Sequence, residues 1–369
     1  MLMSVLSVPF ADLHAQYLSL KMEIDRAIEE VISESAFIRG RFVDQFEENF
    51  KRLIGVQHCI SCANGTDAIY IAMKGLGIKP GDEVITTAHS WISTSETITQ
   101  AGGKVVFCDT SLDNFTIDPA QIEAKITPRT VGIIPVHLYG HPADMGQILV
   151  IAKEHNLWII EDCAQAHLAK YKGQQVGTFG VAATFSFYPG KNLGAMGDAG
   201  ALVSRDSKLA DWCALYARHG GKGEHLIEGI NSRMDGLQAA ILNVKMPMLK
   251  EWTVKRRAIA KRYDELLAGV GDLEVPKVSP DVEHVYHLYV IKTDKRESIQ
   301  RKFKENGVGF SVNYPKALPF YPAYAPLGYT PADFPNAYRN QSRILSIPIF
   351  PEMTEEQQDR VVELVRGCF

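Results

Sequence analysis

The chain has 369 residues, which is enough for one large α/β domain and a smaller second domain. The hydrophobic fraction of 46% and the charged fraction of 22% are typical of a soluble globular protein, and the formal net charge of -4 gives no reason to expect a nucleic-acid partner. Residues 1–10 are apolar, but this run is short, has no basic lead and soon meets Asp12 and His14. We therefore expect neither a signal peptide nor a membrane span, and a cytoplasmic location.

Apolar residues recur at helical intervals in the N-terminal part, over residues 12–35 and again over 42–53. The chain then adopts a strand-then-helix rhythm. Strand-like runs lie at 84–87, 105–108, 131–136 and 157–160, and helical candidates lie near 67–75, 93–101, 119–125 and 144–155. Such alternation predicts a mainly parallel sheet flanked by helices.

The second half of the chain begins as α/β and ends as α+β. Strand-like runs at 182–187 and 199–203 precede helices at 207–218 and 235–267, and we expect Pro247 to break the longer helix. Beyond Gly271 the pattern gives a strand at 287–291, a helix at 299–306, a Pro- and Tyr-rich loop at 314–329 and a final helix from Thr354. We predict a large domain over residues 1–250 and a small C-terminal domain over 251–369.

Two short patterns raise the question of a metal. Cys59 and Cys62 form a CxxC on a strand-like run, but no second CxxC or histidine pair completes a tetrahedral zinc site. His137 and His141 flank a Tyr-Gly pair, which is typical of a loop rather than of a shared helical face. Buried thiols and loop histidines are therefore favoured, and we predict no bound metal.

The run from Asn64 to Ala68 follows a strand-like segment and opens a helix. N–H groups at a helix start lack intrahelical partners and point along the positive end of the dipole. Gly65 allows close approach and Thr66 adds a hydroxyl, so the run is a plausible phosphate seat. An ordinary N-cap turn explains the same residues equally well.

Asp162 and Lys191 each follow an apolar strand. Asp162 ends the run Trp158-Ile159-Ile160-Glu161, at the edge where open α/β sheets bind ligands, although a metal ligand or a helix cap would also suit it. Lys191 stands in a turn rich in Gly and Pro, where small residues leave room for a planar ligand. A partly desolvated lysine amine forms Schiff bases. Together with a phosphate seat, these two residues match the needs of pyridoxal phosphate (PLP).

The sequence resembles the DegT/DnrJ/EryC1/StrS family of PLP-dependent sugar aminotransferases, of fold-type I, over nearly its whole length. The motifs that carry the resemblance are residues 64–68, 161–167, 186–191 and 231–235. The resemblance implies an aspartate aminotransferase-like large domain with a seven-stranded, mainly parallel sheet, and a smaller α+β domain. It also implies a homodimer with shared active sites.

The resemblance further implies roles for single residues. Lys191 would hold PLP as a Schiff base and carry protons, while Asp162 would pair with the pyridine nitrogen and Gln165 with the phenolic oxygen. The other cofactor contacts would come from Gly65, Thr66, the backbone at Asp67, Trp91 stacked on the ring, Ser186, and Asn231 across the dimer interface. Arg233 would bind a carboxylate or form a structural ion pair.

In family terms, glutamate converts PLP to pyridoxamine phosphate, and the amine then passes to a carbonyl of a sugar. We expect a nucleotide-linked keto-deoxysugar for surface polysaccharide. The small-domain loop departs from the pattern, because the Pro-x-Tyr run at 319–321 remains but the usual histidines and Gln are absent and Lys316 is present. His89 is another polar residue expected to face the cofactor. His89, Arg233, Tyr314 and Lys316 are therefore our candidate substrate residues.

Three alternatives remain open. The acceptor could be an acidic sugar without a nucleotide, such as 8-oxo-3-deoxy-octulosonate for lipopolysaccharide. The chain could be a PLP-binding regulator without turnover, although intact Lys191, Asp162 and Gln165 argue against this. An NAD-dependent enzyme is disfavoured, because no G-x-G-x-x-G follows the first strand.

Overall fold

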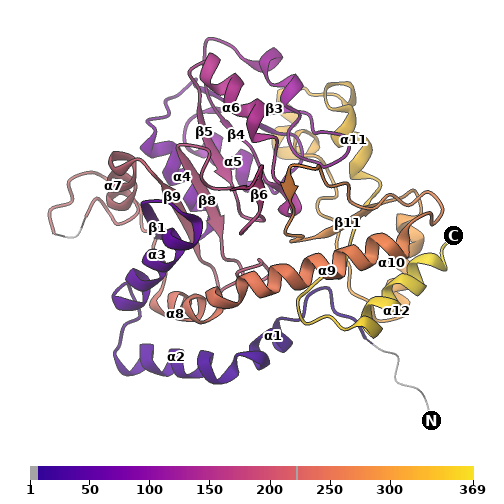
Figure 1. The fold of residues 1–369 in the computed structure, drawn as a ribbon. Helices are drawn as coiled ribbons and strands as arrows, with labels where there is room; N and C mark the ends of the chain where they lie inside the picture. Colours follow the sequence, from indigo (N-terminus) through magenta and orange to yellow (C-terminus); the bar gives the residue numbers. More distant parts are fainter. Residues whose placement is uncertain (1–6, 222) are drawn as a thin grey trace.

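The computed structural model describes residues 7–221 and 223–369. A seven-stranded sheet lies at its centre, with strands in the order β1-β9-β8-β5-β4-β2-β3 (Figure 1). The strands are β1 (His58–Cys62), β2 (Glu83–Thr87), β3 (Lys104–Cys108), β4 (Thr130–Ile134), β5 (Trp158–Asp162), β8 (Ala182–Ser186) and β9 (Gly200–Ser204). Neighbouring strands from β3 to β8 are parallel, and β9 runs antiparallel to both β8 and β1. The predicted mainly parallel sheet is confirmed.

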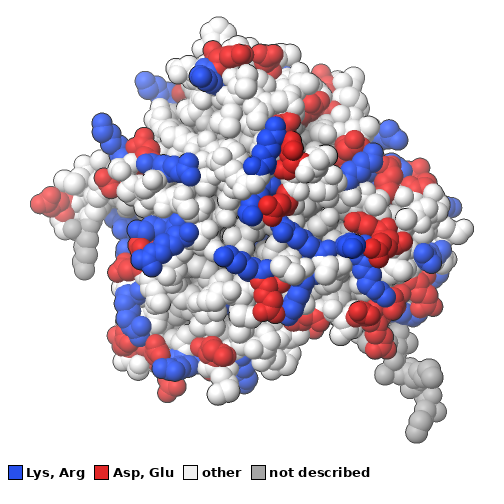
Figure 2. Space-filling view, viewed as in Figure 1, with Lys and Arg blue, Asp and Glu red and all other residues white. Residues whose placement is uncertain are grey.

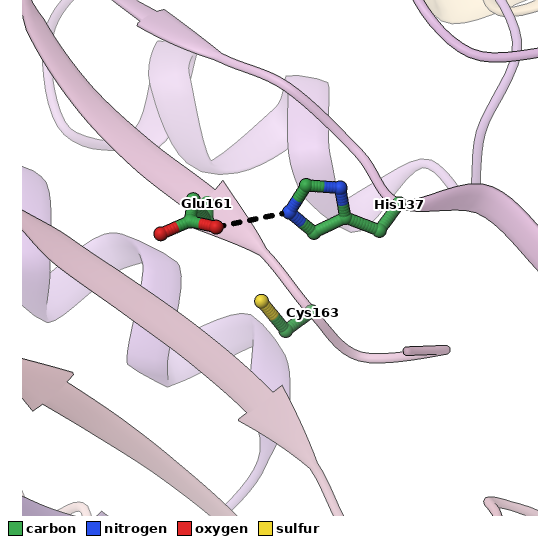
Figure 3. Close-up of side chains that lie close together, drawn as sticks. All are labelled: His137, Glu161 and Cys163. Atoms are coloured by element: carbon green, nitrogen blue, oxygen red, sulfur yellow. Dashed lines mark hydrogen bonds and ion pairs between the residues drawn. The ribbon is translucent and has the colours of Figure 1, made fainter. Parts of the chain in front are cut away.

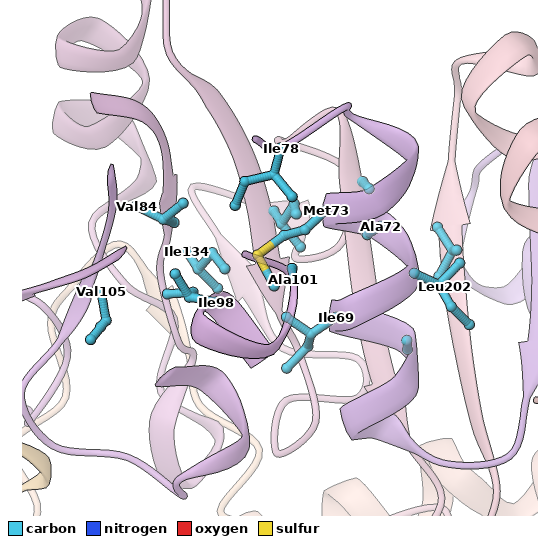
Figure 4. Packing of buried hydrophobic residues seen from close by; sticks show 14 of the residues in the cluster. Ile69, Ala72, Met73, Ile78, Val84, Ile98, Ala101, Val105, Ile134 and Leu202 are labelled. Carbon is cyan, nitrogen blue, oxygen red and sulfur yellow. The ribbon is translucent and has the colours of Figure 1, made fainter. Parts of the chain in front are cut away.

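Helices cover both faces of this sheet. Successive strand residues point to opposite sides, and buried apolar residues lie on both. On one face, Ile160, Ala182 and Leu202 pack with α4 (Gly65–Gly75), α5 (Ser93–Gln100) and α7 (Ser207–Tyr216); Figure 4 shows part of this packing. On the other face, Ala183 and Val203 pack with α3 (Arg41–Ile54) and α8 (Gly236–Lys245), while Ile159 packs with α6 (Met145–Glu154).

Two predicted helices differ in detail from the structure, and a predicted helix break is confirmed. The N-terminal one is divided into α1 (Leu13–Ser19) and α2 (Lys21–Ser33), because the N–H of Leu20 donates to the Tyr17 carbonyl and closes α1 with a tight turn. The helix expected near 119–125 is two 3-10 turns, η1 (Pro119–Gln121) and η2 (Glu123–Lys125). The expected break at Pro247 is confirmed, since η4 (Met246–Met248) separates α8 from α9 (Leu249–Leu267).

The C-terminal part is built on the two-stranded sheet of β11 (Tyr289–Lys292) and β12 (Ile344–Ile347), which are antiparallel. Its helices are α9, α10 (Arg296–Glu305), α11 (Pro335–Gln341) and α12 (Glu355–Arg366). The predicted loop at 314–329 contains the 3-10 turns η5 (Leu318–Phe320) and η6 (Pro322–Leu327), and η7 (Pro331–Asp333) follows. The domain division at residue 250 falls at the start of α9 and stays a prediction.

Several contacts join the N-terminal and C-terminal halves of the chain. Val8 pairs with Val308 and lies in the C-terminal core. The short strand β10 (Val282–Glu283) adds to β6 (Lys170–Tyr171), which pairs with β7 (Gln174–Gln175). Val285 and Leu288 donate their N–H groups to the carbonyls at the turn η3 (Leu138–Gly140).

The surface carries mixed charge: on the face in Figure 2, Lys and Arg side chains intermingle with Asp and Glu. Within residues 7–221 and 223–369, none of the helices combines the length and apolarity that a bilayer crossing requires. The expectation of no leader segment was based on residues 1–10, and residues 1–6 lie outside the described part of the chain.

Candidate active site

Asp162 is the last residue of β5, at the carboxyl edge of the parallel strands, and it is buried. Its carboxylate accepts two hydrogen bonds, from the Thr94 hydroxyl at 2.9 Å and from the Ala164 N–H at 3.1 Å. Burial raises the pKa of Asp162, and both hydrogen bonds and the charge of Lys191 oppose that rise. The result is a buried carboxylate whose two oxygens are fixed in direction.

Lys191 lies in the loop between β8 and β9. Burial lowers the pKa of its amine to about 8, and the charge of Asp162 opposes this shift. Two residues of α8 hold the loop that follows: Lys245 Nζ donates to the Gly194 carbonyl at 2.8 Å, and the Met196 N–H donates to Gln238 Oε1 at 2.9 Å. The sequence therefore places a partly desolvated amine on a restrained loop.

The predicted phosphate seat lies at the N-terminus of α4. The N–H groups of Gly65 and Thr66 have no acceptor among the described residues. The Thr66 hydroxyl lies 2.7 Å from that of Ser93, which sequence reasoning missed. We expected the backbone N–H of Asp67 to contact the phosphate as well. It instead donates to the side chain of the cap residue Asn64 at 2.8 Å.

Close packing brings Ser186 to this seat. A Cβ on Gly65 would lie 2.7 Å from the Ser186 Cβ, closer than real Cβ contacts, so glycine is required for β8 and α4 to meet. A Cβ on Gly200, where β9 begins, would lie 2.2 Å from the Asn64 carbonyl carbon. Backbone N–H groups and the hydroxyls of Thr66, Ser93 and Ser186 thus gather at one helix end, which suits a phosphate.

Gln165, Tyr314 and His89 come together although they are far apart in sequence. Gln165 accepts from the Tyr139 N–H at 2.6 Å and donates to the Tyr314 hydroxyl at 2.9 Å. The Tyr314 N–H donates to His89 Nε2 at 3.2 Å. His89 is 1% exposed, and burial lowers its pKa to about 4. The Trp91 ring, 57% exposed, lies 5.6 Å from that of Tyr314.

These positions revise our picture of the substrate candidates. His89 is not an open polar contact as we expected, because its Nε2 is bonded inside the protein. Lys316 and Asn231 are exposed, and Arg233 is half-buried and forms no ion pair within the described part of the chain. Sequence reasoning also missed Thr94; the only signal for it was a run of hydroxyl residues at 93–95, which alone names no role.

A buried cluster next to the site could be taken for a metal centre. Figure 3 shows ligand atoms of His137, Glu161 and Cys163 directed at one another, and all lie within 4.8 Å. His137 Nε2 lies 3.1 Å from Glu161, while its Nδ1 accepts from the Ala143 N–H. Glu161 also accepts three backbone N–H groups, and burial raises the pKa of the Cys163 thiol. These bonds describe a structural cluster rather than a metal site.

The donors of the site fit PLP part by part. The α4 end offers N–H and hydroxyl donors to a phosphate, Asp162 offers a buried carboxylate to a protonated ring nitrogen, and Lys191 offers an amine that is easily neutral. Gln165 offers an amide beside Asp162. These roles remain proposals that follow from the geometry.

Comparisons with known proteins agree with this chemistry. The model of the DegT/DnrJ/EryC1/StrS aminotransferase family matches residues 19–366. The crystal structure of Streptomyces venezuelae DesV in complex with a ketimine intermediate superposes with a TM-score of 0.95, at 38% identity over 98% of both chains.

Three curated relatives span almost the full chain. A pleiotropic regulatory protein of Geobacillus stearothermophilus is 48% identical over 98% of both chains. The dTDP-3-amino-3,4,6-trideoxy-alpha-D-glucose transaminase of Streptomyces venezuelae is 38% identical over 97% of this chain and 95% of its own. The UDP-N-acetyl-3-dehydro-alpha-D-glucosamine 3-aminotransferase of Acidithiobacillus ferrooxidans is 38% identical over 98% and 97%.

Proposed function

Since the chain belongs to the DegT/DnrJ/EryC1/StrS aminotransferase family and is a PLP-dependent sugar aminotransferase, we propose that it transfers an amino group from glutamate to carbon 3 of a nucleotide-linked keto-sugar. The observation that carries the proposal is the pairing of half-buried Lys191 with buried Asp162 at the carboxyl edge of the sheet, beside the α4 donors. Carbon 3 and the nucleotide come from the two sugar relatives, whose names specify both. The product would serve as an amino sugar of a surface polysaccharide.

When bound, PLP supplies an electron-withdrawing ring to which both the donor and the acceptor amine can be joined. Asp162 would accept a hydrogen bond from the ring nitrogen and keep its proton in place. Lys191 would move a proton from the donor carbon to carbon 4′ of the cofactor in the first half-reaction, and from carbon 4′ to the acceptor carbon in the second. Because burial lowers its pKa to about 8, a substantial fraction of the amine is neutral near physiological pH and ready to accept that proton.

The test separates the two halves of the reaction. The PLP-loaded protein is incubated with glutamate, and 2-oxoglutarate release is measured against a Lys191→Ala control. The pyridoxamine phosphate form of the protein is then incubated separately with four acceptors, and the products are identified by mass. The acceptors are a dTDP-linked 3-keto-6-deoxysugar, a UDP-linked 3-keto-N-acetylglucosamine, a dTDP-linked 4-keto-6-deoxysugar and 8-oxo-3-deoxy-octulosonate. We expect turnover of at least one 3-keto nucleotide sugar.

The other outcomes each point elsewhere. Turnover of the acidic sugar alone would replace the nucleotide-linked substrate by that acid, and turnover of the 4-keto sugar alone would reject carbon 3. The name of the Geobacillus relative favours testing a regulatory role as well. PLP binding without any 2-oxoglutarate release would support that role and contradict transamination.

We also propose that the protein works as a homodimer with shared sites. Exposed apolar side chains are frequent on the N-terminal helices and near the site, as on an interface. They are Leu18, Met22, Ile32, Phe37, Ile38, Trp91, Tyr188 and Met196. Exposed Asn231 would then reach the phosphate bound by the partner subunit.

A further inference from the structure

Hydrogen bonding fixes the orientation of the Gln165 amide. A backbone N–H can only donate, so the atom 2.6 Å from the Tyr139 nitrogen must be Oε1. Nε2 therefore faces the Tyr314 hydroxyl at 2.9 Å. An amide nitrogen carries two hydrogens, so one is used by Tyr314 and the second is available to another acceptor. Gln165 is 4% exposed, so its amide depends on groups of the protein for its hydrogen bonds.

Tyr314 is in turn held from several sides. Its N–H donates to His89 Nε2 at 3.2 Å, and Tyr139 Oη lies 3.0 Å from the same ring nitrogen. Tyr139 Oη also donates to the carbonyl of Asn313, the residue before Tyr314. The Tyr314 ring lies 5.6 Å from that of Trp91 and 6.1 Å from that of His89. Burial raises the pKa of Tyr314, so its hydroxyl keeps its proton.

We propose that Tyr314 is a positioning residue. It holds Gln165 so that the second Nε2 hydrogen points at the phenolic oxygen of PLP. The inference rests on the proposed function, because it takes the phenolic oxygen of bound PLP as the acceptor of that hydrogen. It adds that the small-domain loop takes part in the cofactor side of the site. Tyr314 comes from the segment that departs from the family pattern, and we had placed it only with the substrate.

The role has a spectroscopic consequence. A hydrogen-bond donor to the negatively charged phenolic oxygen draws electron density from it. The Lys191 nitrogen that is joined to the cofactor lies beside this oxygen and then binds its proton less tightly. Loss of the Tyr314 hydroxyl lets Gln165 Nε2 turn away from the phenolic oxygen. The pH at which the yellow band of the bound cofactor is lost should therefore rise.

The experiment is a spectral pH titration of the full-length, PLP-loaded protein, followed at about 410–430 nm. We compare wild type with Tyr314→Phe, Gln165→Leu, the double variant and Tyr324→Phe. The last is a matched control, because it deletes a hydroxyl of the same segment that donates to Ser95 at 2.7 Å. We expect Y314F and Q165L to raise the midpoint by about half a pH unit or more, with no further rise in the double variant. We expect Y324F to leave the midpoint unchanged.

A midpoint that moves in Q165L but not in Y314F would overturn the inference, as would additive shifts in the double variant. Failure of the wild type to give a yellow, glutamate-responsive protein would instead reject the proposed function. Thermal denaturation of each variant checks folding. If Y314F is recovered poorly, Tyr314→Leu removes the same hydroxyl by another route, and the same upward shift is required of it.

Discussion

Asp162 is buried and Lys191 is half-buried, and the loss of solvent moves their pKa values in opposite directions. It lowers that of the amine to about 8 and raises that of the carboxyl group, while the attraction between their charges limits both shifts. At the scale of single residues, this pair gives the site a reactive amine beside a carboxylate that can hold a ring nitrogen.

We expect the cofactor-free protein to capture PLP faster as the pH rises through about 8. Only the neutral amine attacks an aldehyde, and the pKa of Lys191 lies below the ordinary lysine value of 10.5, so the neutral form is gained at about 8. The rate of appearance of the yellow band gives the profile. Lys191→Ala should show no band at any pH, and a midpoint near the ordinary lysine value would contradict the expectation.

Thr94 is expected to support cofactor binding through Asp162. Thr94→Val keeps the shape of the side chain but removes the donor 2.9 Å from the buried carboxylate. A hydrogen bond to a charged group contributes about 1.5–3 kcal/mol, so PLP affinity should fall by about 10-fold or more. Equilibrium titration with PLP measures this. Thr94→Ser retains the hydroxyl and should bind like wild type; equal loss in both variants would indicate packing instead.

The residues of the site differed in how far the sequence could predict them. Asp162 and Lys191 follow apolar strands, so a local pattern already places them at the sheet edge. The bond from Tyr314 to His89 joins residues 225 positions apart, and no local pattern reports such a contact. Thr94 resembles any helix-start hydroxyl until the fold brings Asp162 to it.

At the scale of elements, strands were easier to predict than helix ends. Runs of buried apolar residues mark each parallel strand, and Pro247 marks a break because it lacks an N–H. The division at Leu20 has no Pro or Gly to announce it, since it depends on a single turn of backbone. The 3-10 turns at 119–125 have a helical apolar spacing but are too short to continue as α-helix.

Glu83 is expected to stabilise the start of β2. It is 2% exposed and accepts bonds from Lys104, Arg129 and Thr127. Burial alone would raise the pKa of Glu83, but these bonds outweigh burial and lower it to about 2. Because the folded pKa lies below the ordinary 4.5, the stabilisation is complete above that value and is lost as the pH falls towards 2.

Glu83→Gln should therefore reduce the free energy of unfolding at neutral pH by about 1–2 kcal/mol. The difference from wild type should shrink between about pH 4.5 and pH 2, where the wild-type carboxylate itself becomes protonated. Urea denaturation at several pH values measures both. Glu29→Gln, on the exposed surface of α2, is the control and should unfold like wild type. A constant difference across this pH range would contradict the expected titration.

At the scale of the whole molecule, the site is assembled from distant parts of the chain. Asp162 ends a strand of the large sheet and Lys191 lies in the loop between two of its strands, whereas Tyr314 comes from the C-terminal part. The bonds of Val285 and Leu288 to the η3 turn hold that part against the sheet. Asn231 is exposed on its own subunit, and we propose, as the family resemblance implies, that it belongs to the partner's site.

Subunit mixing tests this assignment. Lys191→Ala removes the reactive amine, and Asn231→Asp sets a negative charge against the phosphate, so each homodimer should be nearly inactive. In a mixed dimer with shared sites, one site carries both changes and the other carries neither. Random exchange of equal amounts should restore about a quarter of wild-type 2-oxoglutarate release, because about half of the dimers are mixed and each has one intact site. Mixed dimers that are found by native mass spectrometry but stay inactive would place Asn231 in its own subunit's site.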